Sequence, residues 1–396
     1  MFVTIGLVCA LFLNAASSGS QHKHSHGEYH HHSDYGWDWQ WPDRKDPEDK
    51  IINKELGEIK SPVTLPPTTL APTPEEYKPC DPYNVKKPDY SAPNRRLSEV
   101  KCYDYIWNVK MQDEVAKRAV DCFVEESRKR NEFAVLSGRE TNEGEFPHMA
   151  AIGWQGTSGS YIFKCGGSLI SPNFVLTAGH CTQVPEDTSI ADTDPKIIRL
   201  GVRNVIIKYV RNIPTDVKIS QIIPHPLYAP PKKYNDIALM KLERDVEFTI
   251  RIYPACLWTN MNVESAGPKG TVTGWGVVKL GAKVTSPTLQ AAEVDMVESG
   301  VCNELLEPHC NRHWCGLEGH QLCAGTLAGG PDTCQGDSGG PIQVKIKLPA
   351  HITMRMYFVL GVTSFGFQCG QPNIPGIYTK VSSFADWIES IVWKQN

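Results

Sequence analysis

From about residue 135 onward, the sequence predicts an all-β domain, a sandwich or barrel built from many short strands. Short β-rich runs alternate there with Gly, Pro and Asn turns, a pattern typical of such folds. A further amphipathic stripe near the carboxy terminus, over residues 383–394, predicts a helix that packs on the strands. The expected strands are 149–154, 163–170, 174–177, 197–200, 237–242, 270–275 and 358–364, and the helical stripe is Phe384, Trp387, Ile388, Ile391 and Val392.

Residues 1–20 read as a secretory signal peptide. An apolar run over 2–13 is followed by small residues, and it is shorter than the about 20 apolar residues that a membrane span needs. The alternative is a buried amino-terminal strand. No later segment has the length and purity of a membrane span, so we expect a secreted, extracellular product. The net charge of −4 gives no basic excess, which excludes nucleic acid or an anionic membrane as the main partner.

The cysteine content supports export. Of 13 cysteines, Cys9 lies in the predicted signal peptide, which leaves an even number in the mature chain. An even set in an exported chain favours disulfides over metal-bound or free thiols.

Residues 21–134 are predicted to be a largely disordered propeptide with three parts. The His-rich stretch 21–50 is either a loose divalent-metal binder or a solvated tail, and its lack of cysteines and spaced carboxylates favours the tail. The Pro-rich stretch 60–82 predicts a semi-extended linker. Residues 98–130 carry apolar side chains at mostly helical spacing. The basic run 128–130 that follows is either a processing site or a solvated helix end.

Three motifs carry the chemistry. Ser338 lies in the glycine-rich run DTCQGDSGGP at 332–341, His180 follows the β-rich run 174–177, and Asp236 precedes the run 237–242. A serine hydroxyl is a poor nucleophile unless a base takes its proton, and glycines let backbone amides approach a developing oxyanion. The order His, Asp, Ser is that of the chymotrypsin arrangement. The alternative, a chance set of turn residues, would not produce all three motifs in this order.

On these motifs, residues 135–396 resemble the chymotrypsin–trypsin family. The resemblance implies two six-stranded antiparallel β-barrels with the active site between them, and a carboxy-terminal helix. It also implies that His180 is the general base and acid, Asp236 orients its imidazole, and Ser338 is the nucleophile. The amides of Gly336 and Ser338 would form the oxyanion hole.

The resemblance also assigns a primary pocket. Asp332 would form its floor and attract the cation of Arg or Lys, while Ser364, Gly366 and Gly376 would form its walls. The alternative is that Asp332 is only a turn residue. Gly179 stands where the family usually has alanine, and because both are small we expect little effect.

The family's disulfides map onto this chain as Cys165–Cys181, Cys302–Cys323 and Cys334–Cys369. Cys310 and Cys315 lie where the family usually has no cysteines, and we expect a local bridge between them. Cys256 matches the position that tethers the catalytic domain to its propeptide. Its partner would be Cys80, Cys102 or Cys122; we favour Cys122, with the other two paired together.

Activation in this family frees an apolar amino terminus whose ammonium pairs with the aspartate before the nucleophile. The matching residues are Val135 and Asp337. The residue before Val135 is Ala134, where a trypsin-like activator would not normally cut. We therefore expect either an elastase-like or chymotrypsin-like activator or an unusual mode of activation. Cleavage after Arg130 would leave a terminus four residues too early.

The propeptide, with its Pro-rich linker, resembles the Snake-like proteases of arthropod body-fluid cascades. Those usually carry a clip domain with six cysteines, and the three cysteines available here cannot assemble one. We therefore expect a secreted zymogen endopeptidase that cuts after Arg or Lys, monomeric, with disulfide-linked light and heavy chains after activation. Its partners would be protein substrates, an upstream protease and serpin-type inhibitors, with no cofactor or metal. The alternative function is a non-catalytic binding or cofactor protein on the same fold.

Overall fold

The computed structural model describes residues 78–130, 144–186, 188–206, 209–210, 213–214, 216–277, 285–329, 337–349 and 351–394. The predicted signal peptide, the His-rich stretch, most of the Pro-rich linker, and both Ala134 and Val135 lie outside these ranges. Part of the primary-pocket and nucleophile loop, 330–336, also lies outside them.

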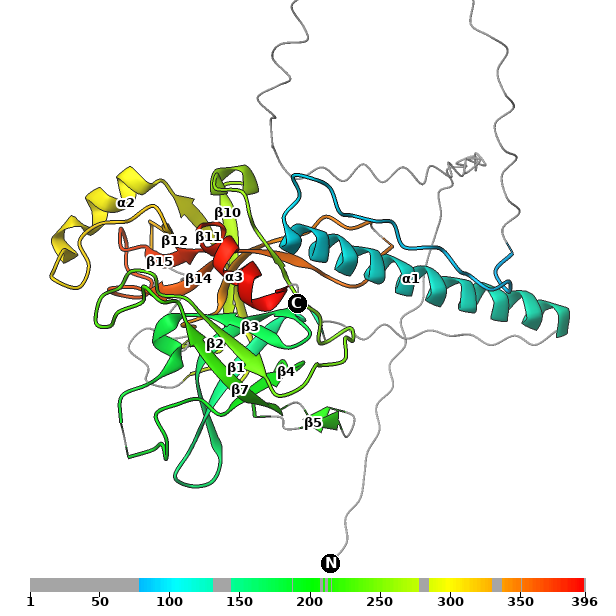
Figure 1. The fold of residues 1–396 in the computed structure, drawn as a ribbon, viewed down its shortest axis with the longest axis horizontal. Helices are drawn as coiled ribbons and strands as arrows, with labels where there is room; N and C mark the ends of the chain where they lie inside the picture. The colour runs from blue at the N-terminus through cyan, green and yellow to red at the C-terminus, as the bar shows by residue number, and fades with distance from the viewer. Residues whose placement is uncertain are drawn as a thin grey trace, which may run out of the picture. The chain divides into compact units, whose positions relative to one another are not determined.

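Six antiparallel strands close the first barrel in the order β1-β2-β3-β8-β7-β4, drawn mainly in green in Figure 1. The strand β3 is buried along its whole length, which explains why its apolar run is continuous rather than alternating. A separate two-stranded ribbon pairs β5 (Tyr209–Val210) with β6 (Ile213–Pro214). The barrel strands are β1 (Met149–Gln155), β2 (Tyr161–Ser171), β3 (Phe174–Thr177), β4 (Ile197–Leu200), β7 (Asp216–Pro224) and β8 (Ala238–Leu242).

The second barrel runs β13-β10-β11-β12-β15-β14, and the pairing of β13 with β14 closes it. The short strand β9 adds to β14 in parallel. Two closed six-stranded barrels confirm the predicted fold (Figure 1). The strands are β9 (Cys256–Leu257), β10 (Lys269–Gly274), β11 (Gln290–Val297), β12 (Gln321–Gly325), β13 (Pro341–Lys345), β14 (Tyr357–Phe365) and β15 (Gly376–Lys380).

The carboxy-terminal helix α3 (Ala385–Val392) follows the second barrel but packs against the core of the first. Phe384 and Ile388 are buried in the same cluster as Ile152, Leu169 and Leu176 of β1, β2 and β3, which confirms the predicted packing stripe. No helix within the described ranges is both long and apolar enough to cross a bilayer. The remaining helices are α2 (Ser299–Leu306) and the 3-10 turns η3 (Gly179–Thr182), η4 (Val263–Ala266), η5 (Glu307–His309) and η6 (Val381–Phe384).

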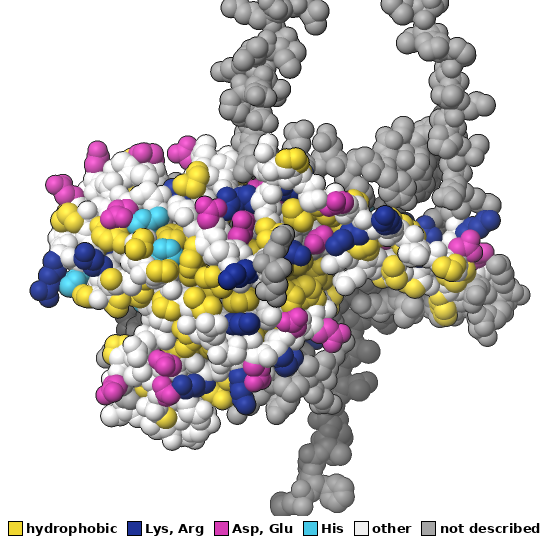
Figure 2. Space-filling view, in the orientation of Figure 1, with side chains coloured by type: hydrophobic (Ala, Val, Ile, Leu, Met, Phe, Trp, Pro, Cys, Tyr) yellow, Lys and Arg dark blue, Asp and Glu magenta, His cyan; other side chains and the backbone are white. Residues whose placement is uncertain are grey.

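The expected helix over 98–130 is present as α1 (Leu97–Arg130). Its first turns pack on the catalytic domain, where Tyr105 and Val109 are buried. Farther along, the apolar side chains are exposed: Val115, Val120 and Phe123 are each about half accessible. Apolar and charged side chains accordingly alternate on the surface of this helix (Figure 2). The apolar repeat therefore serves packing only in the first half of α1.

Polar contacts join the start of α1 to the domain behind it. Glu99 is buried and accepts a hydrogen bond from Thr259 Oγ1 at 2.6 Å. Ser98 Oγ donates to Glu389 Oε1 of α3 at 2.5 Å, and Arg96 Nε reaches the same carboxylate at 3.1 Å. Tyr253 Oη donates to the Tyr105 carbonyl at 2.8 Å. These contacts make the first turns of α1 part of the packed structure.

The disulfide tether differs from the favoured assignment. Cys102 pairs with Cys256, with Cα atoms 5.2 Å apart, and Cys122 pairs with Cys80. The preference for Cys122 was wrong because Cys102 lies on the buried face of α1 beside β9, whereas Cys122 is 20 residues farther along, about 30 Å at helical rise. The Cys80–Cys122 bridge instead joins the chain before α1 to its distal half.

The other described bridges agree with expectation. The structure contains Cys165–Cys181, Cys302–Cys323 and the local Cys310–Cys315 bridge. Cys369 is disulfide-bonded, and its expected partner Cys334 lies outside the described residues.

One buried histidine makes the fold sensitive to acid. His148, just before β1, is 1% exposed and packs against the ring of Tyr357 with centroids 5.3 Å apart. Burial lowers the pKa of His148 to about 4, although the nearby Gln343 side chain opposes this shift. The folded state therefore takes up this proton only well below the pH at which an unfolded histidine does.

We expect the free energy of unfolding to decrease as the pH is lowered from 6.5 to 4, because in this range the unfolded chain binds a proton at His148 and the folded chain does not. Because the folded-state pKa is depressed, the contribution of His148 to stability is complete above pH 6.5 and is lost as the pH falls toward 4. The full contribution is on the order of 3 kcal/mol. Urea titrations at pH 7 and 4.5 measure it. In His148→Gln, which cannot titrate, the fall should be smaller by that amount; an equal fall in both proteins would contradict the assignment.

The revised tether predicts how the chain behaves once it is cut between Arg130 and Gly144. Cut protein should migrate as one species on a non-reducing denaturing gel, because Cys102–Cys256 spans the cut. The double variant Cys102→Ser, Cys256→Ser should separate into two pieces. The matched control Cys80→Ser, Cys122→Ser removes a bridge within one piece and should stay joined. Separation of the Cys80→Ser, Cys122→Ser variant into two pieces would instead restore Cys122 as the tether.

Candidate active site

His180 stands at the end of the first barrel, in the turn η3 that follows β3. Strand β3 is wholly buried and Ala178 is still extended, so the chain leaves the barrel only at Gly179. A Cβ built on Gly179 would lie 2.8 Å from two ring atoms of Tyr228. An alanine at this position would therefore require the Tyr228 ring to shift, whereas glycine fits without any movement.

Asp236 lies just before β8 and is 2% exposed. Its Oδ1 accepts the His180 backbone N–H at 2.8 Å, and its Oδ2 lies 2.8 Å from His180 Nδ1. An ionised carboxylate only accepts, so the proton of the neutral imidazole sits on Nδ1. His180 Nε2 is then left as the basic nitrogen, and 31% of the side chain is accessible to solvent.

A hydroxyl group from the second barrel also contacts the Asp236 carboxylate. Ser364 Oγ of β14 donates to Asp236 Oδ2 at 2.5 Å, and Thr379 Oγ1 of β15 donates to the Asp236 carbonyl at 2.8 Å. Burial alone would raise the pKa of Asp236, but the His180 charge and the hydrogen bonds from His180 and Ser364 hold it below its ordinary value. Asp236 therefore stays ionised at neutral pH.

Ser338 lies in the turn before β13, where it contacts strands of both barrels. Its carbonyl accepts the Gly166 N–H of β2 at 2.8 Å, and the next amide, Gly339, donates to Thr363 of β14 at 2.8 Å. Gly339 has φ of 79°, and a Cβ there would lie 2.2 Å from Thr177 Oγ1. Only glycine fits, both by conformation and by space. The turn thus places Ser338 against the strand end that leads to His180.

Asp337 is placed by two glycines. The Gly276 N–H donates to Asp337 Oδ1 at 2.8 Å. A Cβ on Gly274 would lie 2.0 Å from that oxygen, and one on Gly276 would lie 2.4 Å from Oδ2. The carboxylate rests directly over the backbone after β10, where any side chain would displace it.

The described pocket-wall residues come together at one edge of the second barrel. Because Phe365 of β14 pairs with Ile377 of β15, Gly366, which directly follows β14, lies beside Gly376 of β15. A Cβ on Gly366 would meet no atom of the described residues within 4 Å. Ser364, predicted as a wall, directs its hydroxyl to Asp236. Asp332 and Gly336 lie outside the described residues.

Tyr228 and Thr379 are site residues that sequence reasoning missed. Both act through long-range contacts, Tyr228 on Gly179 and Thr379 on Asp236, and neither stands in a motif. The sulfurs of Cys165 and Cys181 lie near His180, within 4.8 Å, but they form a disulfide and so offer no thiolate to a metal.

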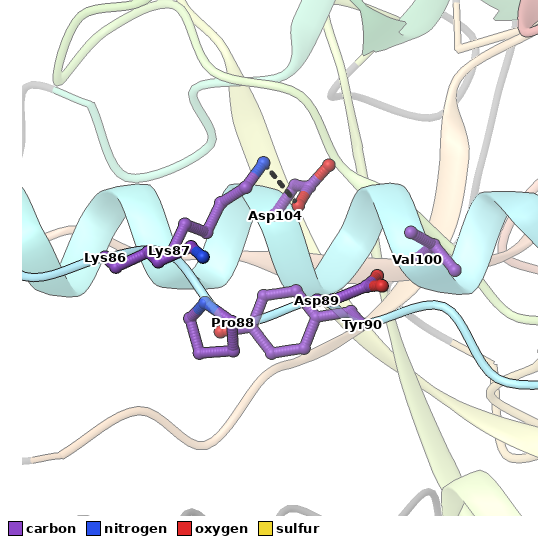
Figure 3. A pocket seen from close by; sticks show the side chains of 7 residues that line it. All are labelled: Lys86, Lys87, Pro88, Asp89, Tyr90, Val100 and Asp104. Atoms are coloured by element: carbon purple, nitrogen blue, oxygen red, sulfur yellow. Dashed lines mark ion pairs between the residues drawn. The ribbon is translucent and has the colours of Figure 1, made fainter.

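A separate hollow of about 610 Å³ lies between α1 and the preceding segment (Figure 3). An ion pair between Lys87 and Asp104, at 2.9 Å, crosses one side of it. None of its lining residues belongs to the triad candidates or the pocket walls, so this hollow is not part of the candidate active site.

Comparisons with known proteins agree with this geometry. Residues 135–388 match the family described as Trypsin. The chain is similar to Serine protease snk of Drosophila melanogaster, 41% identical over 267 residues, which are 66% of this chain and 58% of that protein. Serine protease Hayan of the same species is 39% identical over 66% of this chain and 39% of its own length. Proclotting enzyme of Tachypleus tridentatus is 32% identical over 64% of this chain and 65% of its own length. The match spans less than two thirds of each relative.

The Asp236–His180 coupling leads to a direct test by Asp236→Asn. An amide can present its NH₂ group to Nδ1, which favours the wrong imidazole tautomer, so kcat for peptide hydrolysis should fall by roughly 10⁴-fold. Steady-state kinetics on active-site-titrated protein measure the fall. The control is Asp245→Asn, whose carboxylate accepts from the Asn173 side chain at 2.7 Å away from His180. Equal kcat values for Asp236→Asn and Asp245→Asn would contradict the role assigned to Asp236.

Proposed function

The chain belongs to the trypsin family of serine proteases, and on this premise we propose that it is a secreted zymogen endopeptidase that cleaves after Arg or Lys in an extracellular proteolytic cascade. The observation that carries the proposal is the buried Asp236 carboxylate bonded to His180. Ser338 lies in a turn held against the strands that lead to and support that pair.

The proposed reaction follows from these positions. His180 Nε2 takes the Ser338 proton as its hydroxyl attacks the scissile carbonyl, and the same nitrogen returns the proton to the leaving amine. Asp236 stabilises the imidazolium that forms between these steps. The amides of Gly336 and Ser338 bind the developing oxyanion. Water then repeats the attack on the acyl-enzyme and frees the serine.

The proposed specificity depends on Asp332. A carboxylate at the pocket floor would pair with the cation of Arg or Lys, and desolvation on binding would strengthen the pair. The glycines at 366 and 376 support this proposal, because the open space around Gly366 suits the entry of a long side chain.

We also propose that activation cleaves the Ala134–Val135 bond and that the new ammonium of Val135 pairs with Asp337. The position of the Asp337 carboxylate, over glycines 274 and 276 and next to the nucleophile, supports this role. After cleavage, the Cys102–Cys256 bridge would keep the light and heavy chains together as one monomeric enzyme.

The cascade setting is drawn from relatives. The name of the relative Proclotting enzyme denotes an enzyme of clotting, and the chain would likewise act on a protein substrate after an upstream protease has cut it. Serpin-type inhibitors would be its regulators. The disulfide-rich fold suits the extracellular space.

The test uses the full chain with residues 130–134 replaced by Asp-Asp-Asp-Asp-Lys, so that enteropeptidase leaves Val135 as the terminus. We expect hydrolysis of peptides after Arg and Lys only once the chain is cut. Ser338→Ala should lose about 10⁶-fold in kcat while unfolding at an unchanged temperature. Asp332→Ser should lose about 100-fold in kcat/KM on Arg substrates.

Two results would overturn the proposal. Cut protein with a confirmed Val135 terminus that neither hydrolyses Arg or Lys peptides nor reacts with a fluorophosphonate serine probe is not a protease of this type. Protein that reacts with the probe but prefers other residues keeps the mechanism and refutes the specificity.

A further inference from the structure

Residues 233–235, which directly precede Asp236, are hydrogen-bonded to a loop of the second barrel. Residues 310–321, which we call the 310–321 loop, precede and enter β12. The Lys233 N–H donates to the His313 carbonyl at 3.1 Å, and Gln321 Nε2 donates to the Lys233 carbonyl at 3.0 Å. Tyr234 Oη donates to the Gly316 carbonyl and accepts from the Cys315 N–H, both at 3.0 Å. The loop thus meets the two residues that lead into Asn235.

The next contact reaches Asn235 itself. Its backbone N–H donates to His320 Nε2 at 3.0 Å. An imidazole nitrogen accepts only when it is unprotonated, so the proton of His320 sits on Nδ1. His320 Nδ1 lies 3.4 Å from Glu318 Oε2, a carboxylate oxygen that can accept from it. Glu318, His320 and Asn235 therefore form a chain with one consistent set of protons.

The surroundings keep this imidazole neutral. Burial lowers the pKa of His320, Lys380 lowers it further, and Glu318 opposes both. His225 also interacts electrostatically with His320. The rings of Tyr234 and Phe384 pack against the His320 ring edge-on, with centroids 6.1 and 5.7 Å away. At neutral pH His320 is therefore an acceptor for Asn235.

The held residue has an uncommon backbone conformation. Asn235 has φ of 55°, in the left-handed region, which asparagine enters more readily than most non-glycine residues. Asp236 follows directly, and its carboxylate must meet His180 and Ser364 at hydrogen-bonding distance. A change in the Asn235 backbone would rotate or shift this carboxylate.

We propose that His320 is a positioning residue of the active site, which holds Asp236 in register with His180 through the Asn235 amide, and that Glu318 selects the tautomer that can do so. The catalytic consequence rests on the proposed function. Protonation of His320 turns Nε2 into a donor facing another donor, which breaks the contact. Acid thus removes the support that the Asn235 amide gives to Asp236.

The experiment compares three variants in the enteropeptidase-activated chain. His320→Phe keeps the ring packing against Tyr234 and Phe384 but removes the acceptor. His320→Gln offers an amide oxygen that can accept from Asn235 and cannot titrate in this range. His351→Phe is the control, since His351 is an exposed histidine 3.9 Å from Asp113 on α1.

We expect His320→Phe to lower kcat about tenfold with KM within twofold, because misplacement of a catalytic group costs rate more than binding. His320→Gln should recover kcat to within about twofold, and His351→Phe should match wild type. On the acid limb, log kcat/KM of wild type should fall more steeply than that of His320→Gln, which lacks the titrating imidazole.

Hydrogen exchange provides a readout that needs no catalysis. The Asn235 amide, followed in peptides covering 229–239, should exchange about tenfold faster in His320→Phe than in wild type or His320→Gln. Wild-type kcat and wild-type exchange in His320→Phe would overturn the proposal. If the wild-type enzyme is itself inactive, the proposed function fails, and the exchange rates still decide whether His320 holds Asn235. If His320→Phe does not fold, the acid slopes of wild type and His320→Gln decide, and equal slopes refute the positioning role.

Discussion

The rest of the site depends on one buried negative charge. The Asp236 carboxylate is almost completely removed from water, and such a charge is tolerated only when hydrogen bonds replace its hydration. Two donors come from His180 of the first barrel and one from Ser364 of the second. The same interaction therefore orients the imidazole, keeps the carboxylate ionised and joins the two barrels at their shared edge.

Close approach between the barrels is the second constraint, and glycine satisfies it. The nucleophile turn passes so near β2 and β3 that Gly339 admits no side chain, and the Asp337 carboxylate lies against the backbone at Gly274 and Gly276. These glycines are spread over the sequence from the β10 end to the nucleophile motif. Their common feature is that another segment lies within a few ångströms of the glycine: β2 and β3 of the first barrel at Gly339, and the Asp337 carboxylate of the glycines' own barrel at Gly274 and Gly276. These short distances leave little freedom for the position of Ser338.

The propeptide helix is part of the same folded unit. The buried pair of Glu99 with Thr259, the contacts of Arg96 and Ser98 with Glu389, and the Cys102–Cys256 bridge all act on the first turns of α1. The distal half of α1 lacks such burial, and its apolar side chains are exposed. A cut after residue 130 would therefore leave the helix attached to the two barrels.

The sequence by itself determined strands with dense apolar runs, such as β3 and β4, the stripe of α3, and the local motifs that carry His180, Asp236 and Ser338. It did not reveal β7 or β11, because these strands expose much of their surface and lack a clear pattern of buried positions. Only the tertiary structure decided that Cys102 rather than Cys122 meets Cys256, that Ser364 donates a hydrogen bond to Asp236, and that the Tyr228 ring lies against Gly179. A local pattern records which face of an element is buried, whereas these choices depend on which distant atoms the folded chain brings within a few ångströms.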